Sequence, residues 1–422
     1  MFEQVEERRL LLEKYLQLVS QDPRISNSQT FNTFLLAAQQ ETRRERSENV
    51  SLDVFLMNEH KVSVTILTVE QTDVVLEQVC KELNIPEDLM YCFSLFLIRR
   101  DEDGDITIVR KLQDFESPYI SQKALSAMEE SSDNTGFAGP LKIVLRKSSW
   151  DASLDDRLLV EQPTLNLLFI QTVVDMERGW VLPSAETKQQ LALMQARGSK
   201  RQYMEVARTL PFYGFLIFRP CITNHPEEHT QVTVALGRAS LNMRLHTPSG
   251  DTKEISFKVT RMRCWRIMTT EARDQQGNLS LLRPEHSRLE LSFEYLVTSE
   301  RLEWITIVSH QAILMSMCLQ SMVEELVRIR GGEREPARVT RCEAKRLLAS
   351  RNPKGVDDQL DQSPEADEGC GGPMDYTVRK LAERFSVVNM MATSKAAEDV
   401  FVENEVFSSE PEEGEDLVAA TR

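Results

Sequence analysis

The chain has 422 residues, of which 27% are charged, and a formal net charge of −16 at pH 7. That length is enough for about three domains of ordinary size, and the acidic balance argues against a general nucleic-acid binder. No apolar run approaches the roughly 20 residues needed to span a bilayer. Cysteines without a CxxC pair fit reduced thiols in the cytosol, and the first residues lack a signal-peptide pattern, so we expect a cytoplasmic protein.

Residues 1–40 predict two short helices, at Glu6–Ser20 and Ser28–Ala38, because apolar residues recur there at helical spacing. Two helices of this size bury too little surface to form a stable domain. We therefore interpret them as the end of a larger domain, and the polar stretch Gln39–Asn49 as a linker.

Residues 50–150 change to a period of two, which is typical of strands. A hairpin is predicted around the turn Asn58-Glu59-His60, followed by a helix from Thr72 to Leu83 and an apolar strand at Tyr91–Arg99. This order is that of a ubiquitin-like fold. The acidic turn Asp101–Asp105 lacks the bidentate glutamate of a calcium-binding loop, so we do not expect a calcium site.

Residues 151–210 predict a small helical bundle with helices at Thr164–Met176, Ala185–Ala196 and Lys200–Thr209. Residues 211–330 return to strand patterns and end in a helix, an order typical of pleckstrin-homology and phosphotyrosine-binding domains. The candidate strands are Tyr213–Phe218, Gln231–Leu236, Leu241–Leu245, Ile255–Ile267, Leu289–Val297 and Leu302–Val308.

The last of these strands runs directly into the closing helix, and the two together predict a groove for an extended peptide. If Ile305 and Ile307 face a core, Trp304 points to the opposite side of the strand. Its indole can pack under the helix, or it can anchor a ligand at a sheet edge. The spacing alone leaves both interpretations open.

Residues 331–422 have the composition of a disordered tail. Glycine and proline punctuate its first part, Tyr376–Met390 has the spacing of a short amphipathic helix, and Glu398–Asp416 carries acidic residues without a basic one. Such an acidic run is usually solvated, but its interspersed apolar residues also fit a motif for a partner.

The sequence contains no pattern that indicates catalysis, a cofactor or a metal ion. The phosphate-binding, dinucleotide-binding, zinc-protease and serine-hydrolase motifs are all absent from it. His225 and His229 have helical spacing, but Pro226 between them disfavours a helical metal site. We expect a protein that is not an enzyme.

Several segments resemble the PX–FERM sorting nexins, from residue 4 to about residue 330. EERRLLLEKYLQ and QDPRISNSQTFNTFL are similar to the end of a PX domain. The FERM lobes are matched by YCFSLFLIRR, VRKLQDFESPY, LNLLFIQTVVDMERGW, VTRMRCWRI, LELSFEYL, LEWITI and CLQSMVEELV. The resemblance implies an α+β fold of three FERM lobes (ubiquitin-like at 50–150, helical at 151–210 and phosphotyrosine-binding-like at 211–330), preceded by PX helices and followed by the acidic tail.

The resemblance also implies a cargo adaptor on the cytoplasmic face of early endosomes. In the family, the PX domain binds phosphatidylinositol 3-phosphate, and the third FERM lobe binds Asn-Pro-x-Tyr or Asn-x-x-Tyr motifs in receptor tails, including those of integrins and lipoprotein receptors, which are then recycled to the cell surface. The peptide adds a strand to the lobe. Mapped onto this chain, the peptide-binding residues are Trp304, Ile305, Thr306, Ile307, Val308, Met315 and Leu319.

Arg8 matches the family's arginine that contacts the inositol hydroxyls. The sheet, the arginine-rich motif and the Pro-Pro-x-Lys loop that complete the lipid pocket are not found in this sequence. We therefore expect weak or no headgroup-specific phosphoinositide binding in a liposome assay.

The stretch Asn404–Leu417 resembles the family's acidic motif that docks onto the retriever recycling complex, with Phe407, Glu415, Asp416 and Leu417 as candidate residues. Five residues follow Leu417, and we expect them to weaken this docking. Alternatively, the acidic tail folds back on Arg261, Arg263 and Arg266 and inhibits cargo binding. The alternative function is a FERM-type membrane–cytoskeleton linker or signalling scaffold, although the acidic tail offers no basic helix for actin.

Overall fold

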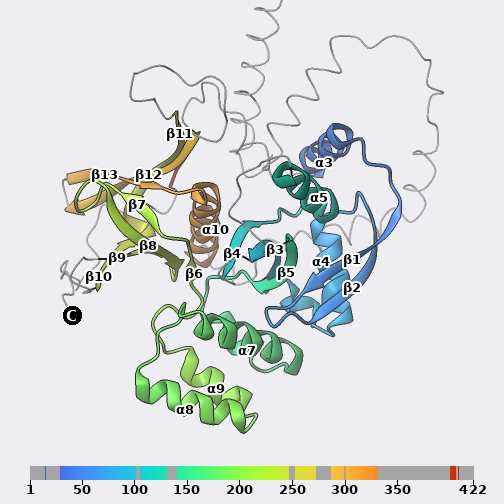
Figure 1. Ribbon diagram of the computed structural model, residues 1–422, viewed down its shortest axis with the longest axis horizontal. Coiled ribbons are helices and arrows are strands. Elements are labelled where there is room, and N and C mark those ends of the chain that lie inside the picture. The colour runs from blue at the N-terminus through green and yellow to red at the C-terminus, as the bar shows by residue number, and fades with distance from the viewer. Residues whose placement is uncertain are drawn as a thin grey trace, which may run out of the picture.

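The computed structural model describes residue 15 and residues 29–100, 105–130, 140–246, 252–271, 287–298, 301–330, 400–404 and 407. These residues form three lobes, and the long helix α10 (Ala312–Arg330) stands between the sheets of the third and the first lobe (Figure 1). Within them, no helix combines the length and the apolar character that crossing a membrane requires.

The first lobe is a five-stranded mixed sheet with the order β2-β1-β5-β3-β4, in which β1 and β5 run parallel. The predicted hairpin is confirmed, since β1 and β2 pair antiparallel from Asn49↔Leu67 to Phe55↔Lys61. The elements of this lobe are β1 (Asn49–Phe55), β2 (Lys61–Leu67), α4 (Thr72–Glu82), η1 (Glu87–Cys92), β3 (Phe93–Arg100), β4 (Ile106–Lys111), α5 (Pro118–Glu130) and β5 (Lys142–Lys147).

Helix α3 (Gln29–Arg43) packs against α5 of the first lobe (Figure 1). The carboxamide of Gln39 donates to Ser121 Oγ at 2.9 Å and accepts from the Ser117 backbone N–H at 2.8 Å. The helix is longer than predicted and continues to Arg43, into the stretch interpreted as a linker. The other predicted helix of this region, Glu6–Ser20, lies outside the described residues.

The second lobe is helical, as predicted, and is fixed to the first lobe by buried ion pairs. Arg146 of β5 makes a bidentate contact with Asp175, with N–O distances of 2.9 and 2.7 Å, and Lys147 pairs with Asp155. Buried pairs of this kind set the orientation of two packed elements, because breaking one leaves an uncompensated charge. The helices are α6 (Leu154–Leu158), α7 (Gln162–Glu177), α8 (Ala185–Ala196) and α9 (Lys200–Ala207).

The third lobe is one sheet with the order β10-β9-β8-β7-β13-β12-β11-β14, with β6 paired to β8. The prediction of one strand at Ile255–Ile267 is wrong, because the 3₁₀ turn η2 (Val259–Arg261) separates β10 from β11. The strands are β6 (Leu216–Ile217), β7 (Cys221–Thr223), β8 (Thr230–Gly237), β9 (Ser240–His246), β10 (Thr252–Lys258), β11 (Met262–Glu271), β12 (Ser287–Thr298), β13 (Arg301–Val308) and β14 (Val400–Glu403).

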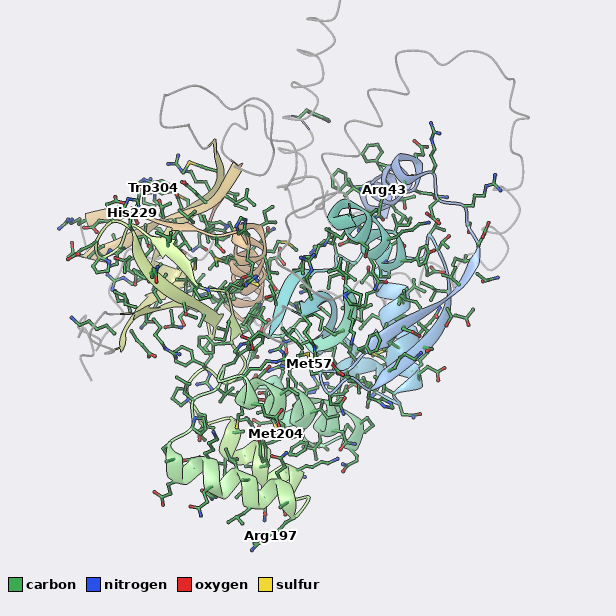
Figure 2. The ribbon with its side chains drawn as sticks, in the orientation of Figure 1. Arg43, Met57, Arg197, Met204, His229 and Trp304 are labelled. Atoms are coloured by element: carbon green, nitrogen blue, oxygen red, sulfur yellow. The ribbon has the colours of Figure 1, made fainter. Side chains whose placement is uncertain are left out.

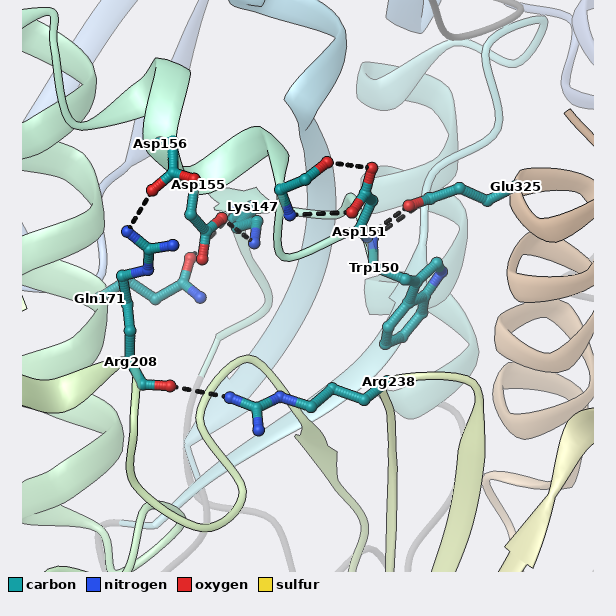
Figure 3. Close-up of polar contacts among 10 residues, drawn as sticks. Lys147, Trp150, Asp151, Asp155, Asp156, Gln171, Arg208, Arg238 and Glu325 are labelled. Atoms are coloured by element: carbon teal, nitrogen blue, oxygen red, sulfur yellow. Dashed lines mark hydrogen bonds and ion pairs between the residues drawn. The ribbon is translucent and has the colours of Figure 1, made fainter. Parts of the chain in front are cut away.

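Helix α10 is tied at both ends to the other lobes. At its start, Gln311 donates to the Ile108 carbonyl of the first lobe at 2.7 Å and accepts from the Arg219 backbone N–H at 2.9 Å. Near its end, the carboxylate of Glu325 accepts the backbone N–H groups of Trp150 and Asp151, which lead into the second lobe (Figure 3). Ile313, in the first turn of α10, is buried in the third lobe's core cluster.

We expect Glu325→Ala to destabilise the chain by roughly 1–3 kcal/mol, because two backbone N–H groups at the lobe junction lose their acceptor. The free energy of unfolding in urea would measure this loss. Glu324→Ala is the matched control, since Glu324 is exposed and its side chain accepts from Gln320 on the helix surface. Equal stabilities of the two variants would contradict a role for Glu325 in holding the lobes together.

Candidate peptide-binding edge of the third lobe

The strand predicted to receive a peptide, β13, is an interior strand. It pairs with β12 along its length and with β7 at Ile307 and Val308. Asn224, which follows β7, pairs with the next residue of β13. Its backbone N–H donates to the Thr306 carbonyl at 3.2 Å, and its side-chain oxygen accepts from the Thr306 N–H at 2.8 Å. The prediction that this strand offers a free edge is therefore wrong, because both of its sides are already hydrogen-bonded.

The seven residues predicted to bind peptide fall into two groups. The core group lies between the sheet and α10 and is almost fully buried: Ile305, Ile307, Met315 and Leu319. The outer group lies on the opposite face of the strand: Trp304, Thr306 and Val308. The side chain of Trp304 is 37% exposed, and the Arg266 guanidinium carbon lies 4.6 Å from its ring centroid, so the indole does not pack under α10.

The side of β11 that faces away from β12 is where an extended segment adds to this sheet. Strand β14 from the tail pairs with it antiparallel, in the register Cys264↔Glu403, Trp265↔Val402, Arg266↔Phe401 and Ile267↔Val400. A segment far along the chain thus occupies this edge as an added strand. Backbone pairing of this kind is a recurring mode of peptide recognition.

At the start of β11, three backbone carbonyls accept hydrogen bonds from Asn404 of the tail instead of from a regular neighbouring strand. The turn η2 and the irregular register between Met262 and Cys264 turn these carbonyls toward the edge. The carboxamide of Asn404 donates to the Val259 and Met262 carbonyls at 2.8 and 2.6 Å, and its backbone N–H donates to the Arg263 carbonyl at 3.1 Å. A primary amide has two N–H donors, so one asparagine satisfies both side-chain contacts.

The chain turns immediately after this asparagine. The backbone N–H of Phe407 donates to the Asn404 carbonyl at 3.2 Å, which is the hydrogen bond of a four-residue β-turn. The segment therefore presents a strand, an anchored asparagine and an aromatic residue three positions later. No β-turn signal was recognised here from the sequence, although the Asn-x-x-Phe spacing could have indicated one.

The core-facing side of this edge is tightly packed. Trp265 is fully buried below α10, and its indole N–H donates to Ser316 Oγ at 3.0 Å. On the other face, Arg263 pairs with Glu294, and the nearby thiol of Cys264 donates to the same carboxylate at 3.7 Å. Cys264 is buried, and burial raises the pKa of its thiol, so this cysteine is a packed group rather than a nucleophile.

The described residues show no constellation that indicates chemistry. They contain no group of three or more potential metal ligands. Cys80, Cys92, Cys221, Cys264 and Cys318 are buried free thiols, and burial raises the pKa values of Cys92, Cys221 and Cys318 to about 12. Thiols that stay protonated at neutral pH are poor nucleophiles.

Four of the other predicted residues lie outside the described residues, namely Arg8, Glu415, Asp416 and Leu417. Phe407 of the predicted tail motif is described and closes the turn on the β11 edge. Of the arginines considered for contact with the tail, Arg261 donates to the Val297 carbonyl, and Arg263 contacts the tail through its backbone carbonyl.

Family models match the chain along most of its length. A sorting nexin 17/27/31 model of the FERM F1 lobe matches residues 50–150, a sorting nexin 17/31 F2-lobe model matches residues 151–211, and the sorting nexin 17 FERM C-terminal domain matches residues 214–327. A PX-domain model matches residues 2–38. The three lobes thus form a FERM module joined to PX-domain sequence.

Curated relatives agree with these matches. Sorting nexin-17 from Danio rerio is 42% identical over 405 residues, covering 94% of this chain and 81% of the relative. Sorting nexin-17 from Bos taurus is 47% identical over 325 residues, covering 77% and 67%. Sorting nexin-31 from Homo sapiens is 33% identical over 321 residues, covering 76% and 70%. The chain belongs to the PX–FERM sorting nexin family.

We expect Asn404→Asp to release β14 from β11, because a carboxylate cannot donate to the Val259 and Met262 carbonyls and brings a negative charge against them. Hydrogen exchange of backbone amides in Cys264–Ile267 should then accelerate about tenfold or more. A chain lacking residues 398–422 gives the reference for a fully open edge. Unchanged protection in Asn404→Asp would contradict the anchoring role of the carboxamide.

Proposed function

We propose that the chain is an endosomal cargo adaptor whose third lobe binds Asn-Pro-x-Tyr or Asn-x-x-Tyr motifs in receptor tails, including integrins and lipoprotein receptors, and promotes their recycling to the cell surface. The observation that carries this proposal is the occupied β11 edge. The chain's own Val400–Glu403 adds a strand there, Asn404 is anchored by three hydrogen bonds, and Phe407 follows at the spacing of the tyrosine in such motifs.

The chemistry of this edge suits an asparagine followed by a turn. The ladder to β11 uses backbone groups and supplies affinity for many sequences, whereas the paired Val259 and Met262 carbonyls require two donors from one side chain. Aspartate has no donor when ionised, and alanine would remove both side-chain donors and leave the Val259 carbonyl only its hydrogen bond from the Met262 N–H. The edge therefore selects asparagine at this position of a ligand.

The same edge cannot hold the tail and a receptor peptide together. In this proposal the tail is a competing intramolecular ligand, which replaces the electrostatic form of self-inhibition expected from the acidic run. The stretch Asn404–Leu417 is also the one that resembles the retriever-docking motif, and Asn404 and Phe407 lie in the docked turn. A receptor tail that displaces this segment would make it available to the recycling complex.

The membrane side of the proposal depends on the PX sequence. In the family this domain binds phosphatidylinositol 3-phosphate, and the PX model matches residues 2–38 here. Gln39 and the Lys123–Glu45 ion pair, at 2.9 Å, hold the end of this region on the first FERM lobe. That packing supports a defined position of the PX sequence on the FERM module, and weak or no headgroup-specific phosphoinositide binding by this chain is still expected.

Deleting residues 398–422 should raise the affinity for a synthetic Asn-Pro-x-Tyr receptor peptide about tenfold or more, because the apparent affinity scales with the fraction of molecules whose edge is open. Isothermal titration of the full and the shortened chain measures this at low and at physiological salt. A gain that persists at physiological salt supports strand competition, and a gain confined to low salt supports charge screening by the acidic run.

The same titration separates peptide binding from tail competition. A control peptide with alanine in place of the asparagine should bind neither chain. If the shortened chain also fails to bind the Asn-Pro-x-Tyr peptide, the cargo-adaptor proposal is wrong. Binding of equal strength to both chains would leave the adaptor function standing and remove the competing role of the tail.

A further inference from the structure

The outer face of the third lobe carries a stack of one arginine on one tryptophan. The guanidinium carbon of Arg266 on β11 lies 4.6 Å from the ring centroid of Trp304 on β13. Arg266 is directly opposed to Ser292, and Glu294 is directly opposed to Trp304, so the arginine side chain crosses over β12 to reach the indole. Ser292 and Glu294 are accordingly buried, although they lie on the outer face.

The stack lies next to the peptide edge rather than within it. Trp304 is 37% exposed and lies well away from the helical lobe, which Met204 and Arg197 mark in Figure 2. In the register of β14, the position opposed to Arg266 is the third residue before the anchored asparagine. Directly opposed residues of an antiparallel pair project to the same face. A peptide bound in this register therefore presents that residue to the outer face.

The neighbouring peptide position faces the other way. The second residue before the asparagine is opposed to Trp265, which points into the core below α10. Side chains alternate between faces along a strand, so the two positions are read by separate surfaces. One surface is the core-facing side of β11, and the other is the outer stack.

We propose that Arg266 and Trp304 are specificity-determining residues that select an aromatic side chain at the third position before the asparagine of a bound peptide. This inference rests on the proposed function and adds a second recognition position to it. The chain's own docked segment has phenylalanine, Phe401, at this position of the register.

The physical basis is the extended side chain of Arg266. Its guanidinium is held over Trp304, so its aliphatic stem lies along the outer face beside the peptide position and offers an apolar surface to an aromatic ring. Opposed Cβ atoms in an antiparallel pair lie about 4.5–5.5 Å apart, which brings a large side chain into reach. A lysine at this peptide position would instead bring a like charge against Arg266. The indole also restricts the arginine, so less rotamer freedom is lost on binding.

The test compares Asn-Pro-x-Tyr peptides that differ only at this position, with phenylalanine, alanine or lysine, by titration against the full chain. We expect phenylalanine to bind about two- to fivefold more tightly than alanine, the range of a favourable cross-strand side-chain pair, and lysine to bind most weakly. Competition by the tail scales all affinities by the same factor, so it cancels in the ratios. Arg266→Ala should bring the phenylalanine-to-alanine ratio close to one.

Two controls show that the effect is local. Arg263→Ala removes a neighbouring arginine that is already paired with Glu294, and it should leave the ratio unchanged. In Arg266→Ala, the effect of substituting alanine two positions before the asparagine of the peptide should be the same as in the parent chain, since that position is opposed to Trp265. Trp304→Phe and Arg266→Lys are the second pair of variants if Arg266→Ala lowers stability, and both should reduce the ratio without unfolding the lobe.

The outcomes separate the two levels of inference. If no peptide binds, the proposed function fails. If the peptides bind but the ratio is the same in the parent chain, Arg266→Ala and Trp304→Phe, then the stack does not read the ligand and this inference is wrong. Trp304→Ala should likewise reduce the ratio and leave binding of the alanine peptide nearly intact.

Discussion

The burial of α10 on several sides is the constraint on which the rest of the molecule depends. A helix that closes a sheet in one lobe needs one apolar face, but this helix is enclosed through most of its first half by the third lobe and the first lobe together. Gln311 and Glu325 use their side chains to hold backbone groups of other lobes. Because Trp265 of β11 is packed below the same helix, the peptide edge inherits the rigidity of the whole three-lobe body.

The edge itself results from a local departure from regular sheet structure. A continuous strand from β10 into β11 would have presented its edge carbonyls at the regular spacing of a strand ladder. The turn at Val259–Arg261 and the irregular register after Met262 create a short run of acceptors that a straight ligand strand cannot reach. An asparagine placed where the ligand turns away can reach them, because its side chain extends back along the direction of the strand. The docking of Asn404 thus follows from backbone geometry rather than from a specialised side chain on the lobe.

Much of the architecture could be predicted from the sequence, because the spacing of apolar residues in long segments distinguishes helices from strands. The β1–β2 hairpin, α4 and three helices of the second lobe, α7, α8 and α9, were predicted from apolar spacing, whereas the five-residue helix α6 was not. The location of the edge could not be predicted. Strand β7 has three residues, too few to show a period, yet it turns β13 from an edge into an interior strand.

The prediction of one strand over Ile255–Ile267 was wrong because its alternation of apolar and polar residues continues across a turn. Ile255–Ile267 alternates well enough to suggest one strand, so the turn that generates the acceptors went unrecognised. The pairing of residues 400–403 with β11 could not be predicted from local sequence patterns, because it joins segments more than a hundred residues apart. The outward direction of Trp304 was correctly derived from alternation. Its contact with Arg266 depends on the order of strands and could not be derived in the same way.

An edge that is occupied by its own chain places a quantitative condition on any ligand. The docked tail loses little translational freedom, so even a short strand and one anchored asparagine can hold a substantial fraction of molecules closed. Each factor of ten in favour of the closed form requires an external peptide to contribute about 1.4 kcal/mol more than it would on an open edge. Backbone pairing alone cannot supply that difference, because the tail makes the same ladder. A ligand that displaces the tail must therefore gain from side-chain contacts, and β11 presents surfaces for them on both of its faces: the core-facing side at Trp265 and the outer side at Arg266. Tail docking in such an arrangement lowers the affinity of every ligand by the same factor, so ligands with weak side-chain contacts no longer bind at working concentrations, while the affinity ratios between ligands stay the same.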